Sequence, residues 1–146
     1  MKKETAQKIL KVVGILYFLA AICCVAFAVI AFTNSVPTVM DELRKNSTIE
    51  VPDGVTFEQI MGGSMVITAL ANCFVGWVLL RAAKNPKKSI LASIILTLSF
   101  VGSIISLVRS NGAWDANRIS LLIRAIIDGF MFGVIISLRL HANDEE

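Results

Sequence analysis

The chain has 146 residues, of which 55% are hydrophobic and 17% are charged, and its formal net charge is +3. Its mean hydropathy of +0.73 is too high for an ordinary soluble domain. Its basic residues are spread over several segments, which argues against a single basic patch for nucleic acid.

Four apolar segments are each long enough to cross a bilayer as a helix. A hydrocarbon core of about 30 Å requires about 20 helical residues at about 1.5 Å each. The segments cover residues 12–32, 60–80, 90–108 and 119–140 and contain 21, 21, 19 and 22 residues. We therefore predict an all-α integral membrane protein, with a single domain over residues 1–146 and four transmembrane helices in an antiparallel bundle.

The first apolar segment has some features of a signal peptide. Lys2 and Lys3 precede it, and Ala26-Phe27-Ala28 resembles a weak cleavage site. Its apolar stretch is longer than the central region of a typical signal peptide. We therefore expect this segment to be retained as a true span.

Residues 33–59 form a larger first extracytoplasmic loop in this prediction. Ser35-Val36-Pro37 can cap and start a helix. Val39, Met40 and Leu43 then fall on one face, which indicates a short amphipathic helix.

The second half of this loop has a more extended pattern. Pro52-Asp53-Gly54 lies between two stretches of β-branched residues, and this arrangement predicts a turn within a small β-hairpin. Thr56 and Gln59 have the spacing of a capping box, which is expected to start the second span.

The other two connections are short. Asn85-Pro86 is expected to end one helix and begin the next, so that the second and third spans are antiparallel neighbours. Between the third and fourth spans, Asn111-Gly112 predicts a turn and Trp114 is a candidate for the membrane interface.

The distribution of basic residues predicts the orientation. Nine lie on one predicted side (Lys2, Lys3, Lys8, Lys11, Arg81, Lys84, Lys87, Lys88 and Arg139) and four on the other (Arg44, Lys45, Arg109 and Arg118). An excess of Lys and Arg stays in the cytoplasm. We therefore predict a multi-pass protein whose N- and C-termini are cytoplasmic.

The three cysteines, Cys23, Cys24 and Cys73, all fall inside predicted spans. A contact of Cys73 with Cys23 or Cys24 is compatible with their depths, although thiols that simply pack are the favoured interpretation. No CxxC or Cys/His spacing is present, so neither a metal site nor a cofactor is expected.

Small residues form a packing face in every predicted span, and Ser99 belongs to the one in the third span. Two of these faces repeat at every fourth position. They are Ser64, Thr68, Asn72 and Gly76 in the second span, and Ala125, Gly129, Gly133 and Ser137 in the fourth. Small residues let helix backbones approach closely in lipid, where apolar surface alone gives no driving force. We predict helix-packing contacts at these positions, either within one bundle or between subunits.

Arg124 and Asp128 form the candidate polar site inside the membrane. They are four residues apart and share a helix face, about 7 Å and about 13 Å below the outer end of the fourth span. Burying a lone charge there costs at least about 2.5–3.5 kcal/mol, so a partner is expected. Asn72 reaches a similar depth on the second span and could hydrogen-bond to Asp128.

Three interpretations of this pair remain open. It can be a salt bridge that fixes helix register or an oligomer interface, a polar site for an ion, substrate or proton, or a charge that pairs with another membrane protein. The spans contain no proline, and the two halves show no repeat of the kind that carriers have.

The layout resembles that of claudin-type tetraspan proteins, which also have four spans and a larger first outer loop. Residues 33–59 lack the tryptophan and the paired cysteines that mark that group, so the resemblance implies no function. Small multidrug carriers place a glutamate in their first span, whereas residues 12–32 contain no charge.

Two classes of function follow from these patterns. The first is a non-enzymatic protein that acts by helix packing, as a self-assembling unit or an accessory subunit of a membrane complex. The alternative is a small transporter or channel that uses Arg124, Asp128 and Asn72. The expected partners are the lipid bilayer and a second copy or a larger membrane protein. Nucleophile, base and metal ligands do not converge, so no enzymatic activity is expected.

Overall fold

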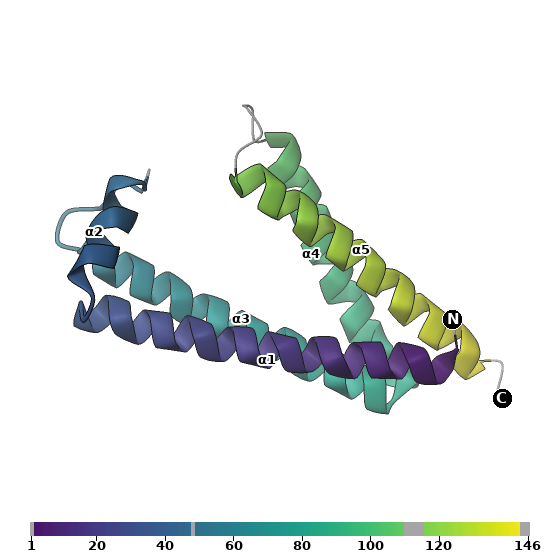
Figure 1. Cartoon of the computed structure of the whole chain (residues 1–146). Helices are drawn as coiled ribbons and strands as arrows, with labels where there is room; N and C mark the ends of the chain where they lie inside the picture. The colour runs from purple at the N-terminus through teal and green to yellow at the C-terminus, as the bar shows by residue number, and fades with distance from the viewer. Residues whose placement is uncertain (1, 48, 110–115, 144–146) are drawn as a thin grey trace. The chain divides into compact units, whose positions relative to one another are not determined.

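The regular secondary structure of the described residues is all helical. The computed structural model describes residues 2–47, 49–109 and 116–143. Its helices are α1 (Lys3–Thr33), α2 (Pro37–Lys45), α3 (Phe57–Lys84), the short 3-10 helix η1 (Pro86–Ser89), α4 (Ile90–Arg109) and α5 (Ala116–Asn143) (Figure 1). The helices α1, α3, α4 and α5 are long and apolar enough to cross a membrane, which agrees with the four predicted segments.

Two of the long helices continue well past the predicted spans. The helix α1 begins at Lys3, before the apolar segment, and α3 continues to Lys84, beyond Leu80. Lys, Glu and Arg are good helix formers, so the polar flanks remain helical. The helix α3 ends before Asn85-Pro86, as predicted, because proline disfavours helical backbone at the residue before it.

The chain divides into two compact units, which are described separately. One unit comprises Met1–Ile15 and Val75–Glu146, and the other comprises Leu16–Phe74. Both α1 and α3 contribute residues to each unit. The assembly of all four long helices into one bundle stays a prediction.

In the unit Leu16–Phe74, a small hydrophobic cluster holds α2 against the neighbouring helix ends. Met40 of α2 is 1% exposed and packs with Ala31 of α1 and Phe57 of α3. Leu43 and Met61 complete the cluster. The predicted amphipathic face of α2 is therefore confirmed for Met40 and Leu43, whereas Val39 is exposed.

The ends of α2 differ in part from the prediction. Pro37 occupies the first turn as expected, but the N-cap residue is Val36 and no side chain caps the helix, so a capping role for Ser35 is wrong. At the other end, the Asn46 side chain donates a hydrogen bond of 3.0 Å to the carbonyl of Glu42. Arg44 binds the carboxylate of Glu58 and lies 5.6 Å from the centre of the Phe57 ring.

The predicted β-hairpin is wrong, although its turn is present. Residues 49–56 are all described and contain no strand. The Val55 amide donates to the Pro52 carbonyl at 3.2 Å, and Gly54 has the positive φ of 83° that this turn requires. An isolated pair of strands is marginal in water, and exposed Ile49, Val51 and Val55 find no apolar surface to support one.

The start of α3 confirms the predicted capping box. The Thr56 amide donates to Oε1 of Gln59 at 2.9 Å, and the Gln59 amide donates to Oγ1 of Thr56 at 3.2 Å. Two amides that the helix cannot satisfy are paired in this way.

In the other unit, α4 and α5 pack side by side as a helical hairpin (Figure 1). The buried residues of the two helices are Ala92, Leu96 and Ser103 in α4, and Ala125, Asp128, Met131, Val134, Ile135 and Leu138 in α5. The helix η1 also contacts α5. The predicted turn at Asn111-Gly112 and the interfacial Trp114 lie outside the described residues.

In the same unit, α1 approaches α3 closely at Gly14. A Cβ atom added to Gly14 would lie 2.9 Å from Cγ of Leu80 and 3.1 Å from the carbonyl oxygen of Gly76. Real Cβ atoms essentially never come within 3.0 Å of such a neighbour. Glycine is therefore required here for the two backbones to touch.

Replacing Gly14 with alanine should lower the free energy of unfolding by about 1–3 kcal/mol, because the Gly76 carbonyl cannot move without shifting α3. Unfolding in mixed micelles, titrated with SDS and followed by circular dichroism, would measure this. The matched control is Gly63→Ala, where nothing lies within 4 Å of the new methyl group. Better helix propensity should leave that variant unchanged or up to about 1 kcal/mol more stable. Equal effects of the two changes would contradict the close approach.

Candidate functional site

Asp128 is the charged residue at the centre of the candidate site. It lies on the face of α5 that packs against α4, and it is only 1% exposed. Its neighbours along this face, Ala125, Met131 and Ile135, are buried and apolar. A carboxylate in such surroundings must be hydrogen-bonded, because the burial of an unpaired charge is very costly.

Ser99 of α4 supplies that hydrogen bond. Its Oγ donates to Oδ2 of Asp128 in a short hydrogen bond of 2.6 Å. The same Oγ accepts a longer hydrogen bond of 3.4 Å from Nη2 of Arg124. A hydroxyl can donate and accept at once, so Ser99 connects the guanidinium to the carboxylate.

Arg124 and Asp128 share this connection but differ in their surroundings. The Arg124 side chain is exposed, whereas Asp128 is sealed between the helices. Arg124 and Asp128 were predicted to pair along one face of α5. In the structure they are connected through Ser99 of α4. This arrangement holds α4 and α5 in one register, because a slip of one residue would move Ser99 away from Asp128.

Asn72, the third residue of the predicted polar site, belongs to the unit Leu16–Phe74. There its Nδ2 lies 3.9 Å from Sγ of Cys24, a weak contact between α3 and α1. Cys23, Cys24 and Cys73 are all free thiols. The hydrogen bond predicted from Asn72 to Asp128 stays a prediction.

The predicted helix-packing residues of the fourth span have different environments. Ala125 is buried against α4, and a Cβ atom at Gly129 would lie 3.6 Å from the Phe100 ring. Ser137 is partly buried and takes part in a further interaction. Gly133 is exposed, and a Cβ atom there would meet nothing within 4 Å.

The predicted helix-packing residues of the second span also differ in burial. Gly76 is buried at the contact with Gly14. Ser64 and Thr68 are exposed, and their hydroxyls donate to the carbonyls of Met61 and Ser64, both at 2.8 Å. These two hydroxyls are satisfied by their own helix and leave an outward-facing surface.

The sequence pattern did not predict the roles of three structurally important residues. Ser99 was only one of several small residues in the third span, and Gly14 and Gly62 belong to no four-residue repeat. A Cβ atom at Gly62 would come within 2.8 Å of the Phe32 ring. For Ser99 a signal existed, since a buried acid in one helix of a hairpin requires a donor in the other.

The described residues offer no set of metal ligands, because no three His, Cys, Asp or Glu side chains among them come together. The site contains the carboxylate of Asp128, the hydroxyl of Ser99 and the guanidinium of Arg124. Comparison with protein-family models, curated proteins and solved structures finds no match for this chain.

Replacing Ser99 with alanine should lower the free energy of unfolding by about 1–3 kcal/mol, because Asp128 loses the donor that satisfies it. The matched control is Thr97→Ala on the same helix. The Thr97 hydroxyl is exposed and donates to its own helix at the Ser93 carbonyl, so its loss should change the free energy by less than about 0.5 kcal/mol. SDS titration of both variants is the measurement. A Ser99→Ala protein as stable as the control would contradict the role assigned to this bond.

Proposed function

We propose that this chain is a multi-pass membrane protein that acts by helix packing, as a self-associating unit or an accessory subunit of a larger membrane complex. Four helices of sufficient length and hydropathy support membrane insertion. In the most apolar window of each, between 17% and 33% is buried within the chain. The remaining surface is left for lipid or for other helices.

The proposed orientation places both termini and the connection between α3 and α4 in the cytoplasm. The basis is the excess of Lys and Arg on that side. In this orientation α2 and the loop after it lie outside the membrane, on the side opposite the termini.

The observation that carries the proposal is the open face of α5 around Gly133. No atom lies within 4 Å of a Cβ atom built there, and Ile126 and Phe130 on the same side are 62% and 60% exposed. A glycine facing lipid gains nothing from that contact, whereas it allows another helix to approach the backbone closely. This face is therefore suited to a helix from a second copy or from a larger partner.

The environment of Asp128 supports the same function. Its carboxylate is enclosed by α4 and α5 and is bound by Ser99. A transport site needs a group that a passing ion or substrate can reach, whereas a group that fixes packing can be sealed. The enclosure of Asp128 therefore favours a packing role over the transporter alternative.

The first test is the mass of the intact complex, purified from membranes in a gentle detergent. We expect the wild-type mass to exceed the 15.9 kDa of one chain, through self-association or a bound partner. Gly133→Leu should reduce it to the single chain while leaving helicity unchanged, because the new side chain enters open space. Ala26→Leu adds bulk at another exposed position, on α1, and should preserve the complex. A wild-type protein that is purely monomeric would refute the proposal.

A second test separates packing from transport. Asp128→Asn removes the charge and keeps a side chain of the same size, so it should alter assembly or stability without changing any flux. Proton uptake into liposomes that contain the protein, read with a pH-sensitive dye, would detect the alternative. If wild-type protein moves protons and a well-folded Asp128→Asn protein does not, the transporter reading is correct.

A further inference from the structure

A cavity with basic residues lies along the last turns of α3. It is lined by Trp77, Leu80, Arg81, Lys84 and Asn85 and has a volume of about 370 Å³. These residues are three or four positions apart, so they occupy one face of the helix. Its volume falls within the range of small-molecule sites, about 300–1,000 Å³.

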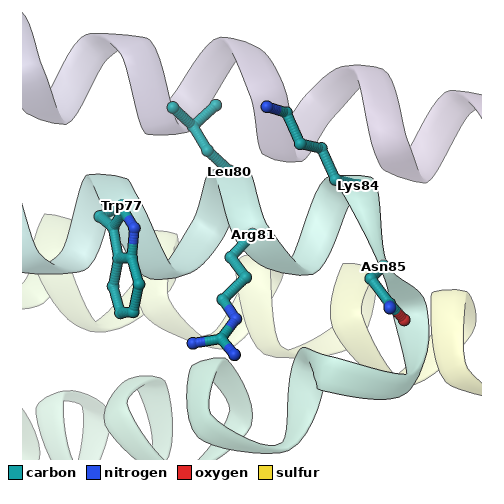
Figure 2. Close-up of a pocket in the computed structure, with 5 residues that line it drawn as sticks. All are labelled: Trp77, Leu80, Arg81, Lys84 and Asn85. Atoms are coloured by element: carbon teal, nitrogen blue, oxygen red, sulfur yellow. The ribbon is translucent and has the colours of Figure 1, made fainter.

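The lining changes from apolar to charged along the helix. Figure 2 shows Trp77 and Leu80 at one end of the group, Arg81 and Lys84 beyond them, and Asn85 at the end of α3. In this view Arg81 points to the same side as Trp77, and Lys84 points to the same side as Leu80, so the two basic side chains diverge from the shared face of the helix. This order matches a molecule with an apolar part and a negatively charged head.

Arg81 lies against the ring of Trp77. Its guanidinium carbon lies 5.2 Å from the centre of the Trp77 ring, in the range of a cation–π interaction. Such a contact uses the face of the guanidinium and leaves its N–H groups for an anion. Among the described residues, no carboxylate forms an ion pair with Arg81 or Lys84.

The charge of this segment also selects an anion. Residues 77–89 contain four basic side chains and no acidic one. A phosphate group suits this arrangement, because a guanidinium and an ammonium are the side chains that bind phosphate most strongly. Trp77 is 47% exposed, and tryptophan favours the level of lipid headgroups.

We propose that this cavity, lined by Trp77, Leu80, Arg81, Lys84 and Asn85, binds the headgroup of an anionic phospholipid from the cytoplasmic leaflet. Arg81 and Lys84 contact the phosphate, and Trp77 and Leu80 contact the glycerol and the first acyl carbons. Basic pockets at this level of a membrane are known to select anionic lipid. The inference rests on the proposed membrane insertion and orientation, but it does not depend on self-assembly.

The test is native mass spectrometry of the full chain in a gentle detergent, with added dioleoyl phosphatidylglycerol or dioleoyl phosphatidylcholine. The acyl chains are identical, so a difference in binding reports the headgroup. Each basic residue at a membrane surface contributes about fivefold in affinity, which gives a preference for phosphatidylglycerol of about 25-fold from two. The double variant Arg81→Gln/Lys84→Gln should lose this preference.

The matched control is Lys8→Gln/Lys11→Gln, which removes two exposed charges on the same predicted side of the membrane. It should keep the preference, whereas equal losses in the two double variants would reduce the effect to general charge attraction and overturn the site. Trp77→Leu should weaken binding of phosphatidylglycerol by several-fold, because it removes the ring that positions Arg81.

Two further outcomes would overturn the proposal. If sn-glycerol 1-phosphate displaced phosphatidylglycerol at equal concentration, the cavity would be a site for soluble phosphate esters. If the wild-type chain bound both lipids equally, there would be no headgroup site. The oligomer mass in the same spectra reports self-assembly, so failure of the proposed function is distinguishable from failure of this inference.

Discussion

Hydrocarbon offers no hydrogen-bond partners, so under the proposed membrane insertion the polar groups of the apolar helices need partners within the chain. The hydroxyls of Ser64, Thr68 and Thr97 each donate to a carbonyl of their own helix at 2.8 Å. The Asp128 carboxylate instead accepts a hydrogen bond from another helix, donated by the hydroxyl of Ser99. The register of the α4–α5 hairpin follows from this difference between a hydroxyl and a carboxylate.

The segment between α1 and α3 is structured only where its apolar side chains are buried against these two helices. Met40 is buried with Ala31 and Phe57, and Arg44 binds both Phe57 and Glu58, so α2 is fixed to the start of α3 by apolar and polar contacts together. Residues 49–55 lack such contacts; their hydrogen bonds are local, from the Ile49 amide to Oγ of Ser47 and from the Val55 amide to the Pro52 carbonyl. Burial, more than local propensity, separates the ordered helix from the irregular stretch that follows.

Features that depend on local chemistry could be predicted from the sequence. The four long helices follow from hydropathy and length, and the capping box of Thr56 and Gln59 follows from spacing alone. Features that depend on partners distant in sequence could not. The hairpin was expected from Pro52-Asp53-Gly54, but strands need a supporting surface that the sequence pattern cannot reveal. In the same way, the depth of Asp128 indicated that a donor was needed, but which hydroxyl of α4 reaches it depends on how the two helices pack.

The order of Ser99 and Asp128 along the chain has a consequence for biosynthesis. In the proposed membrane insertion, α4 leaves the ribosome before α5, so the hydroxyl that Asp128 requires is already available when the acidic residue reaches the translocation machinery. A helix that carries an unpaired charge partitions poorly into oil, whereas a hairpin that has paired it can leave the protein-conducting channel as one body. Under the proposed insertion, the last two helices are expected to enter the bilayer together, because Ser99 of α4 binds Asp128 of α5.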